Sequence, residues 1–168
     1  MNPPLFEVVT PAVSAAARRL TTAAKVQAAL RMGAVDTTLI ESIIDAVSGE
    51  CVRFCNLARG AAGPVPTFGL EVVRATWLGA GMDRGSILIL PWRVPVTAMG
   101  SVVEEGTSLT LNTDFRLVGG GMLERMADDA PVCWSPGKIV VSWTAGWSLP
   151  AEVPAELEGQ VIEQVKMK

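Results

Sequence analysis

The last part of the chain, Lys138–Lys168, changes its hydrophobic period halfway along, and no other stretch constrains the fold as strongly. Its first residues, Ile139–Thr144, are rich in β-branched and aromatic side chains and therefore predict a strand. Pro154 suits the first turn of a helix, where its missing N–H is not needed. Beyond Pro154, apolar residues recur four positions apart and predict a helix. The apolar positions of that helix are Leu157, Val161 and Val165.

Two helices joined by a short loop are predicted in residues 21–60. Thr21 or Thr22 can cap the first helix, and Thr38 with Glu41 fits a capping box for the second. Neither helix can bury its apolar face alone, so each needs the other and the C-terminal helix as partners. The apolar positions of the second helix continue to Gly60 and are Ile40, Ile43, Ile44, Val47, Cys51, Phe54 and Ala58.

Between these helices and the C-terminal helix the hydrophobic period changes to two, and turn residues recur. We expect the first of these strands to use Phe68, Leu70 and Val72 as its alternating apolar positions. Glu105-Gly106 and Gly119–Gly121 predict turns between later strands. The predicted strands cover residues 67–78, 86–90, 96–104, 109–111, 114–118, 122–125 and 139–144, with a loop at 128–137.

These elements predict an α+β fold, in which a small helical bundle (two N-terminal helices plus the C-terminal helix) carries an inserted antiparallel β-module. At 168 residues one domain is the default. The proline-rich start is expected either to be a loose terminus or to lie on a neighbouring subunit. The predicted parts are an extended N-terminal arm at 1–20, a helical hairpin at 21–60, a β-rich insertion at 61–144, and a corner with the final helix at 145–168.

Composition narrows the function. The chain has no histidine, which removes the commonest general base and metal ligand and argues against an enzyme. Hydrophobic residues make up 49 % and charged residues 18 %, so we expect surface buried against partner subunits. A net charge of −3 gives no general reason to expect nucleic-acid binding. No apolar run approaches the ~20 residues of a membrane helix, and the N-terminus lacks a signal-peptide pattern, so an intracellular product is expected.

Several groups of cysteine and carboxylate residues can be interpreted either as chemical sites or as purely structural residues. Cys51 and Cys55 lie one helical turn apart and, with Cys133, could begin a zinc site, but burial as small apolar residues is favoured. The adjacent carboxylates Glu104-Glu105 and Asp128-Asp129 are expected in solvated loops rather than as catalytic pairs. We therefore predict no metal, no cofactor and no catalytic residue.

The glycine and tryptophan residues can likewise be interpreted as parts of a binding site or as purely structural residues. Gly79-x-Gly81 and Gly119–Gly121 could cradle phosphate, but strands rather than helices follow them, so hairpin turns are favoured. The tryptophans Trp77, Trp92, Trp134, Trp143 and Trp147 favour core or subunit packing over a base-stacking surface. A small-ligand pocket would use Asp114, Arg116 and Glu124.

Several motifs in order carry a resemblance to a known family. The chain resembles the gp6-like head–tail connector (adaptor) proteins of tailed bacteriophages, especially the phiE125 gp8-like branch, and the adaptor proteins of gene transfer agents. The resemblance covers nearly the whole chain. The motifs are LTTAAKVQAALRM (20–32), DTTLIE (36–41), ILPWRVPVTAMGSV (89–102), TDFRL (113–117), and VSWTAGW with VPAEL (141–157).

The resemblance implies a structural, non-enzymatic adaptor that assembles as a ring, usually of twelve copies, beneath the portal protein. Its expected partners are the portal, the stopper or tail-terminator protein, other copies of itself, and DNA that passes through the lumen without sequence-specific contacts; no membrane is involved. Its expected location is the virion neck, after assembly in the host cytoplasm. The alternatives are a tail-completion or stopper protein of the same neck, or a small-ligand-binding domain. The predicted portal or subunit interface comprises Leu5, Phe6, Trp147, Val161, Gln164, Val165, Lys166, Met167 and Lys168.

Overall fold

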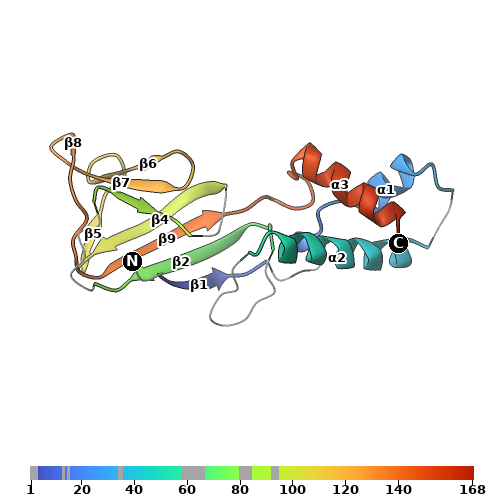
Figure 1. Ribbon diagram of the computed structural model, residues 1–168, viewed down its shortest axis with the longest axis horizontal. Helices are drawn as coiled ribbons and strands as arrows, with labels where there is room; N and C mark the ends of the chain where they lie inside the picture. Colours follow the sequence, from blue (N-terminus) through green and yellow to red (C-terminus); the bar gives the residue numbers. More distant parts are fainter. Residues whose placement is uncertain are drawn as a thin grey trace. The chain divides into compact units, whose positions relative to one another are not determined.

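A computed structural model describes residues 4–12, 14, 16–33, 36–57, 67–79, 85–91 and 95–168. Their helices and antiparallel sheets confirm the predicted α+β class. They divide into two compact units, each described by itself below. The sheet unit lies within Met1–Thr10 and Glu71–Gly146, and the helical unit within Pro11–Ala58, Val65–Leu70 and Trp147–Lys168. Figure 1 labels the elements of both units.

The helical unit is built from three α helices around one apolar core (Figure 1). Its elements are the short 3-10 helix η1 (Ala16–Arg18) and the helices α1 (Ala23–Ala29), α2 (Thr37–Phe54) and α3 (Ala155–Lys166). The predicted spacing of four in α3 places Val161 and Val165 in this core, while Leu157 packs against its margin. The other buried members are Leu20, Ala23, Val26, Ile40, Ile44 and Val47.

The helix caps agree with the sequence for α1 and differ for α2. Thr22 caps α1, because its Oγ1 accepts a hydrogen bond from the Lys25 N–H at 3.2 Å. The capping box predicted for α2 is wrong, since Asp36 is the N-cap and its Oδ1 accepts from the Thr38 N–H at 2.8 Å. Glu41 instead forms an ion pair with Arg19, at 3.1 Å.

Replacement of Asp36 should therefore weaken the helical unit more than replacement of Thr38. Asp36→Ala is expected to lower the free energy of unfolding by about 1 kcal/mol, because the first turn of α2 loses its side-chain acceptor. Urea unfolding followed by helical circular dichroism measures the change. Thr38→Ala is the matched control, and a larger loss for Thr38→Ala than for Asp36→Ala would contradict this cap assignment.

Helix α2 ends earlier than predicted. Its last residue is Phe54 rather than a residue near Gly60, because the chain turns at Cys55 and Asn56 takes a left-handed φ of 49°. Phe54, predicted on the inner face, is 92 % exposed. Ala58 and Gly60, also part of that prediction, lie outside the described residues.

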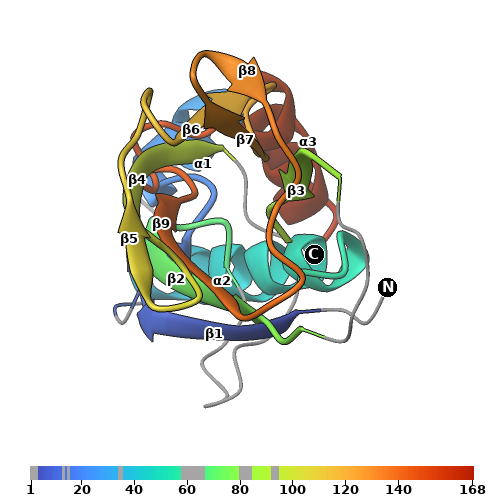
Figure 2. The same ribbon diagram turned by 90° about the vertical axis from the view of Figure 1, so that its left-hand side faces the viewer.

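The sheet unit contains two antiparallel sheets (Figure 2). The first has the strand order β1-β2-β9-β4-β5, and the second the order β3-β7-β6, with β8 paired to β7. The strands are β1 (Leu5–Thr10), β2 (Glu71–Trp77), β3 (Ile87–Ile89), β4 (Val96–Glu104), β5 (Thr107–Leu109), β6 (Phe115–Val118), β7 (Met122–Ala127), β8 (Ala130–Pro131) and β9 (Ile139–Ala145). β5 therefore starts two residues earlier than expected, and β8 lies in the predicted 128–137 loop.

The predicted alternation of the first long strand has the wrong phase. Phe68 and Leu70 belong to the helical unit, where the Phe68 ring lies 5.7 Å from that of Trp147. In β2 the buried positions are the odd ones, beginning with Glu71, which is 2 % exposed. A buried glutamate interrupts the apolar pattern, so alternation alone selected the opposite face. The buried positions of β2 are Glu71, Val73, Ala75 and Trp77.

The core of the sheet unit is centred on β9. Trp143 is fully buried and lies opposite Val73 of β2 and Met99 of β4 in the two ladders. The Phe6 ring of β1 lies 6.3 Å from the Trp143 ring. The tryptophans described in this unit, Trp77, Trp134 and Trp143, are all buried, in agreement with the packing interpretation.

Glycine positions give two different results. Gly119 and Gly120 take φ values of 59° and 76° between β6 and β7, which confirms the predicted hairpin turn there. The turn predicted at Gly79 continues into residues 80–84, which lie outside the described residues. A Cβ atom on Gly79 would lie 2.2 Å from the Pro136 carbonyl oxygen, so glycine permits a close approach of two segments. Gly81 lies outside the described residues.

Candidate interface at the end of the helical unit

The structure separates the predicted interface residues by exposure. Val161 and Val165 are buried in the core of the helical unit, and Phe6 is buried in the sheet unit. Burial leaves these three side chains little surface for a partner. Trp147 is half-buried against Phe68. The exposed members are Leu5, Gln164, Lys166, Met167 and Lys168.

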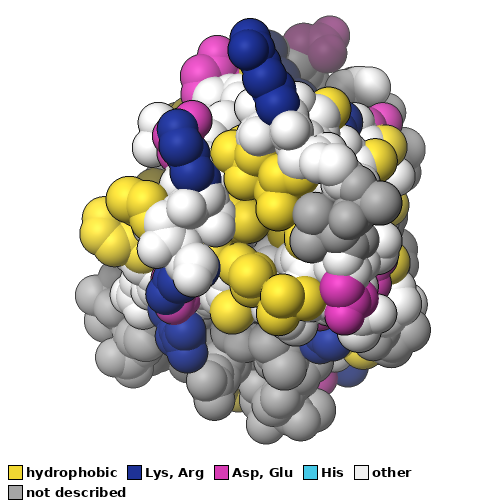
Figure 3. All heavy atoms as spheres, turned by 90° about the vertical axis from the view of Figure 1, so that its right-hand side faces the viewer, with side chains coloured by type: hydrophobic (Ala, Val, Ile, Leu, Met, Phe, Trp, Pro, Cys, Tyr) yellow, Lys and Arg dark blue, Asp and Glu magenta, His cyan; other side chains and the backbone are white. Residues whose placement is uncertain are grey.

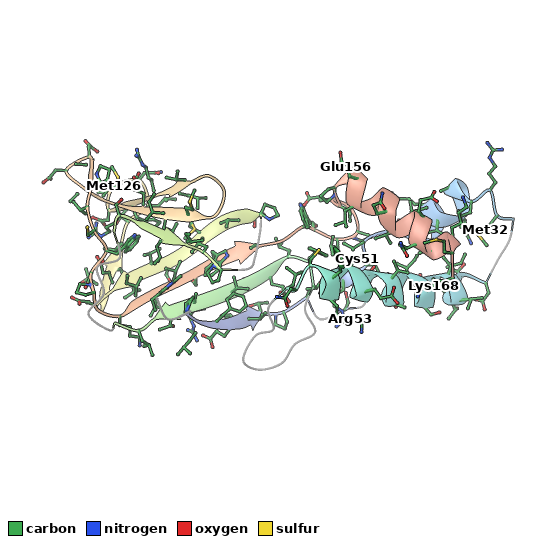
Figure 4. The ribbon with its side chains drawn as sticks, viewed as in Figure 1. Met32, Cys51, Arg53, Met126, Glu156 and Lys168 are labelled. Carbon is green, nitrogen blue, oxygen red and sulfur yellow. The ribbon has the colours of Figure 1, made fainter. Side chains whose placement is uncertain are left out.

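The exposed end of α3 lies near other exposed apolar residues. The end of α1, the start of α2 and the end of α3 meet at one end of the helical unit (Figures 1 and 4). Met167 is 70 % exposed there, Leu39 at the start of α2 is 55 % exposed, and Met32 after α1 is 39 % exposed. We call these three residues, with Arg31 and Lys166, the end face. Leu39 and Met32 were not among the predicted interface residues.

The end face combines apolar and positively charged groups. Figure 3 shows hydrophobic side chains gathered on this end of the helical unit, with both basic and acidic side chains around them. The Lys166 ammonium lies 3.7 Å from Glu163, and both side chains are well exposed, so this pair is weak and leaves Lys166 accessible. Lys168 is held differently, because its Nζ lies 3.1 Å from Glu50 Oε1. An apolar centre with exposed basic residues such as Lys166 at its margin suits an acidic or neutral protein partner.

A groove between α2 and α3 contains another predicted residue, Gln164. Its volume is about 620 Å³. Burial raises the pKa of the Cys51 thiol in its wall, so this thiol stays protonated at neutral pH and is a poor nucleophile. The groove is lined by Val47, Glu50, Cys51, Phe54, Cys55, Leu157, Gln160 and Gln164.

The cysteines are less buried than expected. Cys51 is half-buried, whereas Cys55 is exposed, so the predicted burial as a small apolar residue is wrong for Cys55; Cys133, which was suggested as a third zinc ligand, is exposed as well. Both lie where the chain turns or loops, and helical or strand periodicity does not fix exposure there. Within the described part of the chain, no three Cys, Asp or Glu side chains are grouped closely enough to hold a metal ion.

The carboxylates suggested for other sites make structural contacts. Glu104 is not in a solvated loop, because its carboxylate accepts from Arg125 Nε at 2.9 Å and from the Ser135 N–H at 2.7 Å. Asp128 and Asp129 do lie exposed, in the turn between β7 and β8, as predicted. Nor do the three suggested pocket residues converge: Arg116 pairs with Glu124 at 2.6 Å, and Asp114 accepts from the Thr110 N–H at 2.8 Å.

Together the two units define a protein of the α+β class with a three-helix unit and a two-sheet unit. No protein-family model and no curated protein matches the chain. Across the described ranges, the helices are too short or too polar to cross a membrane.

Solved structures with a similar fold come from gene transfer agent (GTA) particles, and two of those reported below are reconstructions of the neck. The chain is similar to one from "Neck of native GTA particle computed with C12 symmetry", with a TM-score of 0.57, 17 % identity, and coverage of 96 % of this chain and 81 % of that chain. A chain from "Neck of empty GTA particle computed with C6 symmetry" has a TM-score of 0.55 and 18 % identity, and the match covers 96 % of this chain and 82 % of that chain. A chain from "Virion of native gene transfer agent (GTA) particle" has a TM-score of 0.54 and 18 % identity, with coverage of 97 % of this chain and 82 % of that chain. At these identities the likeness shows a shared fold.

Proposed function

We propose that this protein is a structural adaptor of a head–tail connector. In this proposal, copies of the chain form a ring beneath the portal, join the capsid to the stopper or tail, and leave a channel for DNA. The observation that supports it most is the fold match over 96 % of the chain to a chain of a particle neck, in agreement with the motif resemblance. In this role the protein is located in the neck of a phage or gene transfer agent virion. No catalytic step is part of this role.

The end face is the proposed docking site for the portal. It presents three exposed apolar side chains, Leu39 in the first turn of α2, Met32 after α1 and Met167 after α3, which a partner would remove from water. Its basic residues would add long-range attraction to an acidic portal surface and speed association. The same role requires that DNA slide through the lumen, so contacts with DNA should be few and independent of sequence.

Substitution of an end-face residue should weaken portal binding. Met167→Asp places a charge in the apolar contact and is expected to lower the affinity for the portal protein of the same particle by at least about tenfold. Ile89→Asp is the matched control, because Ile89 is 69 % exposed in the sheet unit while Met167 is 70 % exposed. Surface plasmon resonance with immobilised portal measures both. Equal affinities for Met167→Asp and the unmodified chain would contradict the assignment of this face.

A further inference from the structure

The first sheet has two edges that differ in how much described structure covers them. β1 is the first strand in the order, so among the described strands only β2 pairs with it, on one side. At the other edge, β5 pairs with β4 only over Val102–Glu104. Residues 96–101 of β4 therefore pair with β9 on one side and with no described strand on the other. Uncovered strand edges of this kind are ready to pair with another strand.

The two open edges lie at the same level across the sheet. Val8 of β1 is opposite Val73, which is opposite Trp143, which in turn is opposite Met99 of β4. One step further, Thr10 connects in the same way through Val72 and Thr144 to Ala98. The part of β1 near Val8–Thr10 is therefore level with the uncovered part of β4, whereas Leu5 is level with Val103, where β5 is already paired.

The strand directions at the two edges are also complementary. Each step from β1 through β2 and β9 to β4 is antiparallel, so β1 and β4 run in opposite directions. A second copy that repeats the sheet sideways, in the same orientation, would place its β1 antiparallel to the first copy's β4. Such a contact joins two different surfaces, and contacts of this kind generate rings when the rotation between copies closes.

Side chains at both edges permit this approach. The residues of β4 at Thr97, Ala98, Gly100 and Ser101 are exposed, small and uncharged, so no like-charge repulsion opposes an incoming strand. On β1, Val9 is 50 % exposed, and the charge of Glu7 is already paired with Arg74 of the same sheet. Register shifts of β4 against β9, between Val96 and Ala98 and between Met99 and Val102, limit a regular ladder to a short segment.

We infer that copies of this chain join head to tail through β1 of one copy and residues 96–101 of β4 of the next. The occupant of each edge is thus a second copy of the chain, and the sheet continues from copy to copy. This inference rests on the proposed ring and specifies the contact that builds it. It predicts a short antiparallel ladder centred near Val8–Thr10 and Ala98–Met99.

Directed cross-linking tests this contact. In a chain with Cys51, Cys55 and Cys133 replaced by Ala, the double variant Val9→Cys/Ala98→Cys is assembled and treated with a flexible bis-maleimide. We expect a ladder of covalent multimers from the double variant, covalent dimers and no larger species from a mixture of the two single variants, and none from either single variant alone. Efficient cross-linking of Val9→Cys to itself would instead indicate a two-fold β1–β1 contact and would overturn the inference.

Native mass spectrometry before cross-linking separates the two levels of the proposal. A ring that forms but gives no ladder overturns the β1–β4 contact and leaves the adaptor role standing. Absence of any ring, with the portal present, overturns both. As a second variant that needs no cysteine replacement, Val9→Lys should reduce the ring fraction at least about tenfold at a fixed protein concentration. Ile89→Lys, on the second sheet, should leave the ring fraction unchanged.

Discussion

Trp143→Ala is expected to lower the free energy of unfolding of the sheet unit by about 3–5 kcal/mol. The side chain is fully buried on the central strand β9, between Val73 and Met99, and in ring contact with Phe6. Removing the indole ring would leave a cavity, because the neighbouring strands cannot move close enough to fill the space. Urea unfolding followed by circular dichroism measures the loss.

A conservative variant separates packing from hydrogen bonding at this position. The Trp143 indole Nε1 has no hydrogen-bond partner within the described residues, so Trp143→Phe gives up volume but no hydrogen bond there. We therefore expect Trp143→Phe to cost clearly less than Trp143→Ala. Trp147→Ala, in the half-buried position of the helical unit, is a second comparison with a smaller expected loss. Equal losses of unfolding free energy for all three variants would show that packing of the Trp143 side chain on β9 is not a main source of the stability of the core.

Arg125→Ala is expected to destabilise the sheet unit by about 3 kcal/mol. The Arg125 Nε lies 2.9 Å from Glu104 Oε2, and the two side chains are only 18 % and 12 % exposed. The guanidinium also donates to the Asp114 carbonyl at 2.7 Å, so it connects β7, β4 and the turn before β6. Its loss would leave the mostly buried Glu104 carboxylate without a cation, which costs more than the ion pair itself contributes.

A double-mutant cycle measures this coupling. Glu104→Gln removes the charge that Arg125→Ala would leave unpaired, so the double variant should lose less than the sum of the two single variants. Arg116→Ala is the matched control in the same sheet unit, because Arg116 is 52 % exposed in its pair with Glu124 and should contribute less than about 1 kcal/mol. Additive losses for Arg125 and Glu104 would contradict a buried, coupled pair.

Periodicity predicted the elements better than their ends or faces. β4 begins and ends where the residue pattern places it, and α3 buries the predicted Val161 and Val165. The cap of α2 was missed because Asp36 and Thr38 are both good cap residues, and only the backbone conformation chooses between them. The phase of β2 was missed because a buried glutamate looks like a surface residue in the sequence.

The candidate interface was only partly predictable. The same apolar spacing that marks a contact surface also marks a core, which is why Val161, Val165 and Phe6 were included and are in fact buried. Leu39, Met32 and Met167 lie in or next to the ends of three helices that are far apart in the sequence, and no local pattern predicts that these helix ends come to one end of the unit. The open edges of the first sheet depend on register between strands far apart in the chain, which spacing within one strand cannot give.

Electron cryo-microscopy of the purified chain mixed with its portal protein tests the central proposal most directly. We expect a closed ring of copies beneath the portal, with the end face of each helical unit in contact with it and an open channel on the axis. A chain that stays monomeric beside an unoccupied portal would contradict the adaptor role.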